Sequence, residues 1–173
     1  HMHGILEFNL QERWVRVQAG LVKDKLNEFL KPHGLFFSPE LSTSNRATIG
    51  GMINTDASGQ GSLVYGKTSA HVLAVTAVLE DGSLLDAKPV SGSELADKLA
   101  REDREGEIYR QVLATARDKR DEIEANFPKL TRFLTGYDLK HVYEPASETV
   151  DLSRLICGSE GTLAFVTEAK LDL

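Results

Sequence analysis

The order of apolar and polar positions along the chain predicts paired strands followed by a helix. Residues 4–9 and 13–20 flank a polar turn, and the second stretch carries the strand-forming Trp14, Val15 and Val17. Residues 21–34 then change to a helical spacing. Apolar residues recur at i, i+4, i+7 and i+8, and these are Val22, Leu26, Phe29 and Leu30. Pro32 and Gly34 end this predicted helix.

The centre of the chain contains a predicted hairpin. Residues 35–45 are rich in turn-forming residues and indicate a loop. Residues 71–87 read as a strand, an Asp81-Gly82 turn and a second strand. The first arm is apolar at nearly every position, which predicts that it is buried on both faces.

The pattern becomes helical from Ser93 to Phe127. Ser93 is the expected N-cap of the first helix, and Pro128 ends the region. The next helix is expected to bury a narrow apolar stripe made of Ile108, Val112, Ala116 and Ile123. Residues 155–173 close with glycine turns and a strand, which suggests a piece of a longer protein. Hairpins without regular strand–helix alternation favour an α+β fold, a mostly antiparallel sheet flanked by helices.

Composition excludes several functional classes. The chain has 173 residues, a net charge of −6 and a pI near 5.4, which argues against a nucleic-acid-binding surface. Its single cysteine, Cys157, cannot form an internal disulfide or hold a zinc or iron–sulfur site alone, and we expect a buried, inert thiol. No apolar run approaches ~18 residues, so no transmembrane segment is expected, and one thiol fits a reducing, cytoplasmic compartment.

The glycines between residues 47 and 66 allow two interpretations. They can simply shape loops, because glycine pairs are common in turns. Alternatively, a short helix beginning at Gly50-Gly51 could offer unpaired N–H groups to a diphosphate, and glycine would let that ligand approach the backbone. Neither the phosphate-binding loop with its lysine nor G-x-G-x-x-G is present.

Three ordered blocks carry a resemblance to a known family. "ATIGGMINTDASGQGSLVYGKT", "TGYDLKHV" and "GSEGTLAFVTEAKL" resemble the FAD-linked oxidases, also called the PCMH or vanillyl-alcohol-oxidase type. The most similar branch is the D-lactate, glycolate and D-2-hydroxyglutarate dehydrogenase group, and within it the large bacterial type that joins a flavin domain to an iron–sulfur domain. The matching blocks span roughly residues 15–69 and 135–173.

This resemblance implies that residues 1–173 form the second part of an FAD-binding domain, with a helical insertion at about 93–134. The first part with its glycine-rich diphosphate loop, the cap domain and the iron–sulfur domain would lie outside the chain. The full-length protein would bind FAD and an iron–sulfur cluster and dehydrogenate a small D-2-hydroxy acid of the 2-hydroxyglutarate, lactate or glycolate type. It would be cytoplasmic, or associated with a membrane through its electron acceptor. Two alternatives are a non-catalytic subdomain that cannot hold FAD, and the FAD subunit of another oxidoreductase of the superfamily.

The resemblance also implies which residues contact FAD, whereas no catalytic residue and no metal ligand is implied in this chain. The expected contacts are Glu40, Thr48, Ile49, Gly50, Gly51, Asn54, Ser58, Gly59, Gly66, Gly161, Phe165 and Val166. Ala164 departs from the family pattern, which has glycine there. Asp56 is expected to be a local cap. The alternative for Glu40 is an exposed loop carboxylate, and for Phe165 and Val166 it is packing within a strand.

Overall fold

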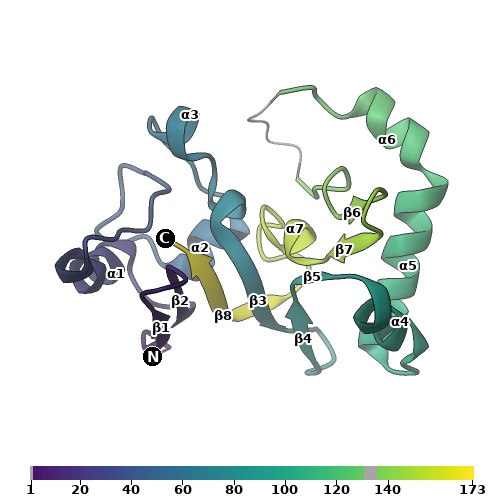
Figure 1. The fold of residues 1–173 in the computed structure, drawn as a ribbon, viewed down its shortest axis with the longest axis horizontal. Helices are drawn as coiled ribbons and strands as arrows, with labels where there is room; N and C mark the ends of the chain where they lie inside the picture. Colours follow the sequence, from purple (N-terminus) through teal and green to yellow (C-terminus); the bar gives the residue numbers. More distant parts are fainter. Residues whose placement is uncertain (1, 131–135) are drawn as a thin grey trace.

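A computed structural model describes residues 2–130 and 136–173 and shows two antiparallel sheets flanked by helices (Figure 1). The larger sheet has five strands in the order β1-β2-β8-β3-β4, and every neighbouring pair is antiparallel. Its strands are β1 (Ile5–Asn9), β2 (Trp14–Gln18), β3 (Val72–Val78), β4 (Leu84–Ala87) and β8 (Phe165–Asp172). The predicted α+β class with a mostly antiparallel sheet is therefore confirmed.

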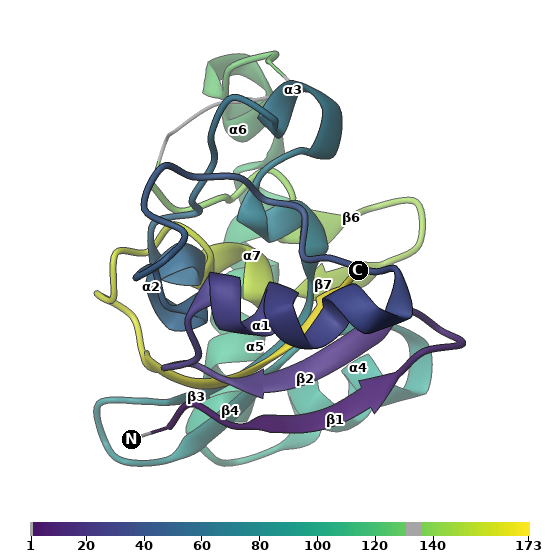
Figure 2. The same ribbon diagram turned by 90° about the vertical axis from the view of Figure 1, so that its left-hand side faces the viewer.

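One face of the larger sheet forms the core. Val15 and Val17 of β2 are fully buried, whereas Trp14 and Arg16, which alternate with them, point to the other face and are only partly buried. Helices α1 (Lys23–Leu30) and α2 (Ile49–Asn54) cover the buried face, and Figure 2 shows α1 lying along β2. The sheet thus packs an apolar face against these helices and turns a more polar face to solvent, as antiparallel sheets often do.

The remaining elements surround a second, smaller sheet. It has the order β5-β7-β6, with strands β5 (Pro89–Val90), β6 (Tyr143–Glu144) and β7 (Thr149–Asp151). Beside it lie the helices α4 (Gly92–Ala100), α5 (Arg104–Asp118), α6 (Arg120–Asn126) and α7 (Ser153–Ile156) (Figure 1). Three short helical turns complete the fold, η1 (Lys31–His33), α3 (Ser62–Tyr65) and η2 (Thr68–His71).

The structure confirms the two N-terminal strands, the first helix, the hairpin and the closing strand, and it corrects two details of burial. The first hairpin arm, β3, is not buried on both faces, because Leu73 is 39% exposed on the solvent side of the sheet. Phe29 on α1 is also exposed, and its ring lies edge-on against Phe8 at a centroid distance of 5.4 Å. Leu26 and Leu30 are buried as predicted.

The helical region also differs in detail. Its first helix is preceded by Ser91, not capped by Ser93, and the second splits at Lys119 into α5 and α6. Ile108 and Val112 are only partly buried, because packing selects the neighbouring face of α5, formed by Tyr109, Leu113 and Ala116. That this region is an insertion relative to related domains remains a prediction, and residues 131–134 of it lie outside the described residues, as does Thr135 at the start of the "TGYDL" block.

The cap of α5 gives a prediction about acid stability. Asp103 accepts a hydrogen bond from Gly106 N–H at 3.0 Å and pairs with the Arg101 guanidinium. The bond from Arg101, followed by that from Gly106, lowers the pKa of Asp103 from 3.8 to about 2. Because the folded pKa lies below the unfolded one, the stabilisation is complete above the unfolded pKa and is lost as the pH falls through the folded pKa.

We expect Asp103→Asn to lower the melting temperature at about pH 6 and to have little effect at about pH 2. Thermal unfolding followed by circular dichroism at both pH values measures this difference. Asp97→Asn on the exposed surface of α4 is the matched control. An equal effect of Asp103→Asn at both pH values would show that the cap acts without its charge.

Candidate functional site

The predicted glycine-rich helix is present as α2, but its N–H groups are already used within the protein. Thr48 is the N-cap, and its Oγ1 accepts from Gly51 N–H at 3.3 Å. Ile49 N–H donates to Leu21 O at 2.9 Å and Gly50 N–H to the carbonyl of Ala19 at 2.8 Å. The prediction that unpaired N–H groups await a diphosphate is therefore wrong, because the turn after β2 pairs those of residues 49 and 50 and Thr48 pairs that of Gly51.

The two adjacent glycines of α2 have different environments. A Cβ atom on Gly50 would lie 2.9 Å from Ala19 Cβ and 3.2 Å from Ala19 O, so this glycine allows α2 to pack on the turn after β2. A Cβ atom on Gly51 would meet only Thr48 Oγ1, at 3.2 Å, and Gly51 is exposed. Gly50 thus serves packing, while Gly51 leaves bare backbone on the surface.

The "GSEG" segment is joined directly to the C-terminal end of α2. Gly158 N–H donates to Ile53 O at 2.9 Å, and Glu160 N–H donates to Asn54 O at 2.8 Å. The second bond pairs the Asn54 carbonyl at the end of α2. The first adds a donor to the Ile53 carbonyl, which also accepts from Asp56 N–H at 3.0 Å. Two predicted contact residues, Asn54 and Gly161, meet here: a Cβ atom on Gly161 would lie 4.0 Å from Asn54 Nδ2.

This junction also holds polar atoms that lack a protein partner. Among the described residues, Asn54 Oδ1 and Ser159 Oγ are buried side-chain oxygens without a hydrogen bond. A buried oxygen left unpaired costs free energy, and such atoms in a native protein call for a water or a ligand. Gly51 and Gly161 are both exposed, and Gly161 has a φ of +76°, which favours glycine. Bare backbone beside unpaired oxygens suits a polar, hydroxyl-bearing ligand.

Three other predicted residues form a separate contact away from this junction. Glu40 Oε2 accepts from Gly61 N–H at 3.0 Å and is exposed, as the alternative interpretation of this residue expected. A Cβ atom on Gly59 would lie 2.3 Å from the carbonyl oxygen of Glu40. The backbone of residue 40 therefore occupies the space that a side chain at position 59 would need. Ser58, next to it, is partly buried.

The last predicted residues lie in three different settings. Phe165 begins β8 and is 66% exposed, whereas Val166 beside it is 3% exposed and packs in the core. Gly66 ends α3 with a φ of +79° and lines a cavity. The structure thus brings Thr48, Ile49, Gly50, Gly51, Asn54 and Gly161 together around α2, and it holds Glu40, Ser58 and Gly59 in the loop region that precedes α3.

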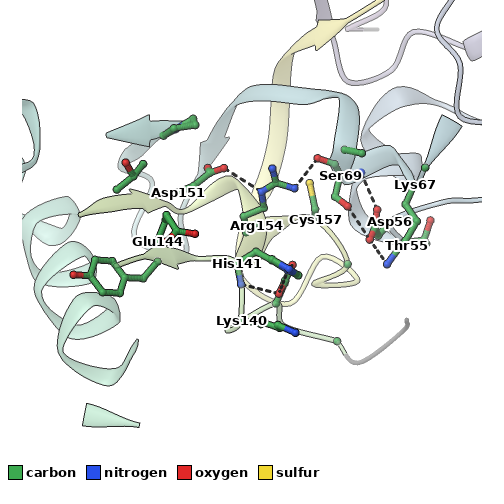
Figure 3. A pocket seen from close by; sticks show the side chains of 18 of the residues that line it. Thr55, Asp56, Lys67, Ser69, Lys140, His141, Glu144, Asp151, Arg154 and Cys157 are labelled. Carbon is green, nitrogen blue, oxygen red and sulfur yellow. Dashed lines mark hydrogen bonds and ion pairs between the residues drawn. The ribbon is translucent and has the colours of Figure 1, made fainter. Parts of the chain in front are cut away.

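A cavity of about 730 Å³ lies on the other side of the α2 C-terminus (Figure 3). Its walls come from residues 55–56 and 66–70, the smaller sheet, α7 and the "GSEG" segment. Gly66 is the one predicted FAD contact among its lining residues. The charged side chains on its walls, which include Asp56, Lys67 and Arg154, were not predicted as site residues.

Asp56 is not the local cap that the sequence suggests. It is 7% exposed, accepts from Ser69 N–H at 2.8 Å and Ser69 Oγ at 3.1 Å, and pairs with Lys67 Nζ at 2.5 Å. It also has a φ of +45°, a conformation that non-glycine residues seldom adopt. Its distant partners explain the error, because a sequence pattern does not reveal which later residues return to α2.

Two further groups line this cavity. Cys157 is buried and unpaired, and burial raises the pKa of its thiol well above the usual range, in agreement with the predicted inert thiol. His141 Nδ1 lies 2.8 Å from Asp138 Oδ2, and His141 N–H bonds Asp138 Oδ1 at 3.1 Å, so Asp138 caps this turn.

Among the described residues, no group of three or more His, Cys, Asp or Glu side chains could hold a metal ion.

The chain was compared with known protein families and curated proteins. A family model described as "FAD binding domain" matches residues 1–88. D-2-hydroxyglutarate dehydrogenase of Pantoea ananatis is 64% identical over 174 residues, and that of Escherichia coli K12 is 60% identical over 174 residues. Each alignment covers 100% of this chain and 17% of the relative. Glycolate oxidase subunit GlcD of Bacillus subtilis is 28% identical over 173 residues, covering 100% of this chain and 26% of that protein.

The chain therefore spans about a sixth of the length of the relatives that it matches at 60% identity or more. Within the residues that the structure describes, no helix combines the length and the apolar character needed to cross a membrane. The family model covers 88 of the 173 residues, from the first strand to the end of the hairpin. Both glycines of α2 lie within this range, as do strands β1, β2, β3 and β4 of the larger sheet. The chain belongs to the FAD-binding domain family.

Proposed function

We propose that this chain is the FAD-binding portion of a flavin-dependent dehydrogenase that oxidises a D-2-hydroxy acid. Four relatives with 55–64% identity over the whole chain carry the name D-2-hydroxyglutarate dehydrogenase. More distant relatives are named for glycolate and D-lactate. Of the three acids, 2-hydroxyglutarate is the proposed substrate of the full-length protein.

The junction of α2 with the "GSEG" segment carries this proposal. Gly51 leaves exposed backbone three residues before Asn54 on α2, and a Cβ atom on the exposed Gly161 would lie 4.0 Å from Asn54 Nδ2. Asn54 Oδ1 is buried and unpaired. FAD fits such a surface because its diphosphate and ribityl chain carry many polar groups. These groups can hydrogen-bond to backbone atoms only where no side chain keeps them apart. Asn54 Oδ1 can accept a hydrogen bond from a ribityl hydroxyl or an amino group. Phe165 offers an exposed ring at the start of β8.

The roles within the site follow from these contacts. Bound FAD supplies the hydride acceptor for oxidation of an alcohol carbon. Gly51 and Gly161 would give the cofactor access to the backbone, and Asn54 would fix its orientation. Thr48, Ile49 and Gly50 would support it indirectly, since their backbone bonds hold α2 against the turn after β2. The base that accepts the hydroxyl proton would lie outside this chain.

Glu40, Ser58, Gly59, Gly66 and Val166 would contribute in a different way. Glu40 and Gly59 would hold the segment before α3 in shape, and Val166 would anchor β8 from the core. An iron–sulfur cluster in the remainder of the full-length protein and a cytoplasmic or membrane-linked electron acceptor are further proposals. They rest on the resemblance to the bacterial fusion type.

A second candidate is that the isolated chain does not retain FAD. The occupied N–H groups at residues 49 and 50 favour it, because the chain then lacks a ready set of donors for the diphosphate. The purified chain should be mixed with FAD, desalted, and scanned between about 300 and 550 nm. Retained flavin bands favour a self-sufficient site, whereas their loss means that other parts of the protein complete it.

The proposed activity needs the full-length protein. Anaerobic addition of D-2-hydroxyglutarate should bleach the flavin band near about 450 nm, and bleaching by D-lactate or glycolate should be slower. L-2-hydroxyglutarate is the stereochemical control. If the protein holds FAD but none of the three D-acids reduces it, the proposed substrate class is wrong.

A further inference from the structure

A chain of polar contacts on the cavity wall joins the residues that follow α2 to the residues that precede the "GSEG" segment (Figure 3). Its members are Asp151, Arg154, Ser69, Asp56 and Lys67, and we call these five residues the polar chain. They belong to β7, α7, η2 and the loops beside them, and they come from two stretches of the sequence, residues 56–69 and 151–154. None of them belongs to the predicted set of FAD contacts.

Arg154 is the centre of the first half. Its Nε donates to Asp151 Oδ2 at 3.2 Å, and its Nη1 donates to the main-chain carbonyl of Ser69 at 3.0 Å. Asp151 is itself buried and accepts from Ser153 N–H at 3.0 Å. The guanidinium of Arg154 on α7 therefore bridges β7 and η2 with two differently directed bonds, a geometry that arginine supports and lysine does not.

Asp56 is the centre of the second half. Both of its carboxylate oxygens bond Ser69, and Oδ2 also pairs with Lys67. The carbonyl oxygen of Ser69 thus accepts a hydrogen bond from Arg154, while its N–H and hydroxyl both donate to Asp56. Because Asp56 adopts a left-handed φ of +45°, the surrounding contacts must over-determine its position. The polar chain supplies these contacts.

Asp56 and Arg154 are close in sequence to the two segments of the proposed cofactor surface. Asp56 follows Asn54 by two residues, and Arg154 precedes Gly158 by four. On the other side, Gly158 and Glu160 bond the carbonyls of Ile53 and Asn54. The segments are therefore fixed both through the direct backbone bonds and through the polar chain. Removing one link would leave the relative position of Asn54 and Gly161 less well defined.

We propose that Arg154 and Asp56 are positioning residues that hold α2 and the "GSEG" segment in the arrangement that binds FAD. This inference rests on the proposed function. Neither side chain is required to touch the cofactor. Both act through Ser69, so each needs the other, and the loss of either has the same consequence for the proposed surface.

The test uses the full-length protein carrying Arg154→Gln, Arg154→Lys, Asp56→Asn, or the Gln and Asn changes together. Dissociation constants for FAD are measured by fluorescence titration well below the melting temperature. The visible circular dichroism of the bound flavin reports its geometry. Arg117→Gln is the matched control, because Arg117 also makes two side-chain contacts, to Tyr143 OH at 3.3 Å and Glu148 at 3.2 Å, outside the polar chain.

Arg154→Gln and Asp56→Asn should each weaken FAD binding about tenfold, and the double variant should be no weaker than the worse single one. Arg154→Lys should resemble Arg154→Gln, because it keeps the charge but loses the bridge. Arg117→Gln should bind FAD normally, even if its melting temperature falls. Unchanged FAD affinity in Arg154→Gln, or effects that multiply in the double variant, would overturn the inference.

A parallel measurement on Gly51→Val separates this inference from the function on which it rests. If Gly51→Val keeps its FAD, the proposed surface is wrong, and the inference is overturned with it. If Gly51→Val loses FAD while Arg154→Gln does not, the surface stands and the positioning role alone is overturned. Loss of FAD affinity in both variants supports the proposed surface and the positioning role of Arg154.

Discussion

Gly51→Val is expected to release FAD from the full-length protein and to leave the fold of this chain intact. Gly51 is exposed, and its new Cβ would meet only the Thr48 hydroxyl at 3.2 Å, a contact that a shift of a few tenths of an ångström relieves. Valine also disfavours a helix no more than glycine does. The two γ-methyl groups would instead fill the space that the cofactor needs. A misfit of this size corresponds to a loss of about 10- to 100-fold in FAD affinity.

The neighbouring glycine provides the control. Gly50→Val should lower the melting temperature of the apoprotein, because its Cβ would press on Ala19 Cβ and Ala19 O. Flavin content after desalting and the melting temperature of the apoprotein measure the two effects separately. A Gly51→Val protein that still carries one FAD per chain would contradict the proposed surface.

Gly59→Ala is expected to destabilise the fold itself, with or without FAD. The added Cβ would lie 2.3 Å from Glu40 O and 2.9 Å from the carbonyl carbon of the same residue. Both are backbone atoms, so relief requires the whole segment around residue 40 to shift. Overpacking of this kind typically costs about 1–3 kcal/mol of unfolding free energy. Urea denaturation of the apoprotein measures the change.

Gly61→Ala is the matched control for this effect. Its Cβ would also lie close to Glu40, at 2.6 Å, but the atom concerned is Oε2 at the end of a flexible side chain. The carboxylate can move away, and the change should cost little beyond the bond from Gly61 N–H. Equal losses for Gly59→Ala and Gly61→Ala would show that the contact with the residue 40 backbone is not what requires glycine.

Long elements with a clear period could be predicted from the sequence, whereas short ones could not. The helix at 23–30 shows apolar residues at helical spacing, and the hairpin at 72–87 has the Asp81-Gly82 turn between two apolar stretches. Strands β5 and β6 have two residues each, too few for any period to be visible. In α5, Tyr109 and not Ile108 is on the buried face, and this face packs against α4, where Lys98 lies over the Tyr109 ring. The local pattern of α5 does not contain that information.

In the candidate site, too, some features could be predicted from the sequence and others depend on contacts made only in the folded chain. The glycines of α2 could be found from a sequence motif, because a bare backbone is a property of the residue itself. The partners of Ile49 and Gly50 N–H are carbonyls at residues 21 and 19, and only the folded chain reveals that these bonds exist. The contact between Arg154 and Ser69 joins positions 85 residues apart. The left-handed conformation of Asp56 likewise depends on these distant partners.

The position of β8 has a consequence for how this part of the protein forms during translation. β8 is the last strand to be synthesised among the described residues, yet it pairs with both β2 and β3 in the middle of the larger sheet. Until residues 165–172 leave the ribosome, β1-β2 and β3-β4 can exist only as separate hairpins, which are marginal in water. Their apolar faces therefore stay exposed to chaperones for most of the time that the segment is being made.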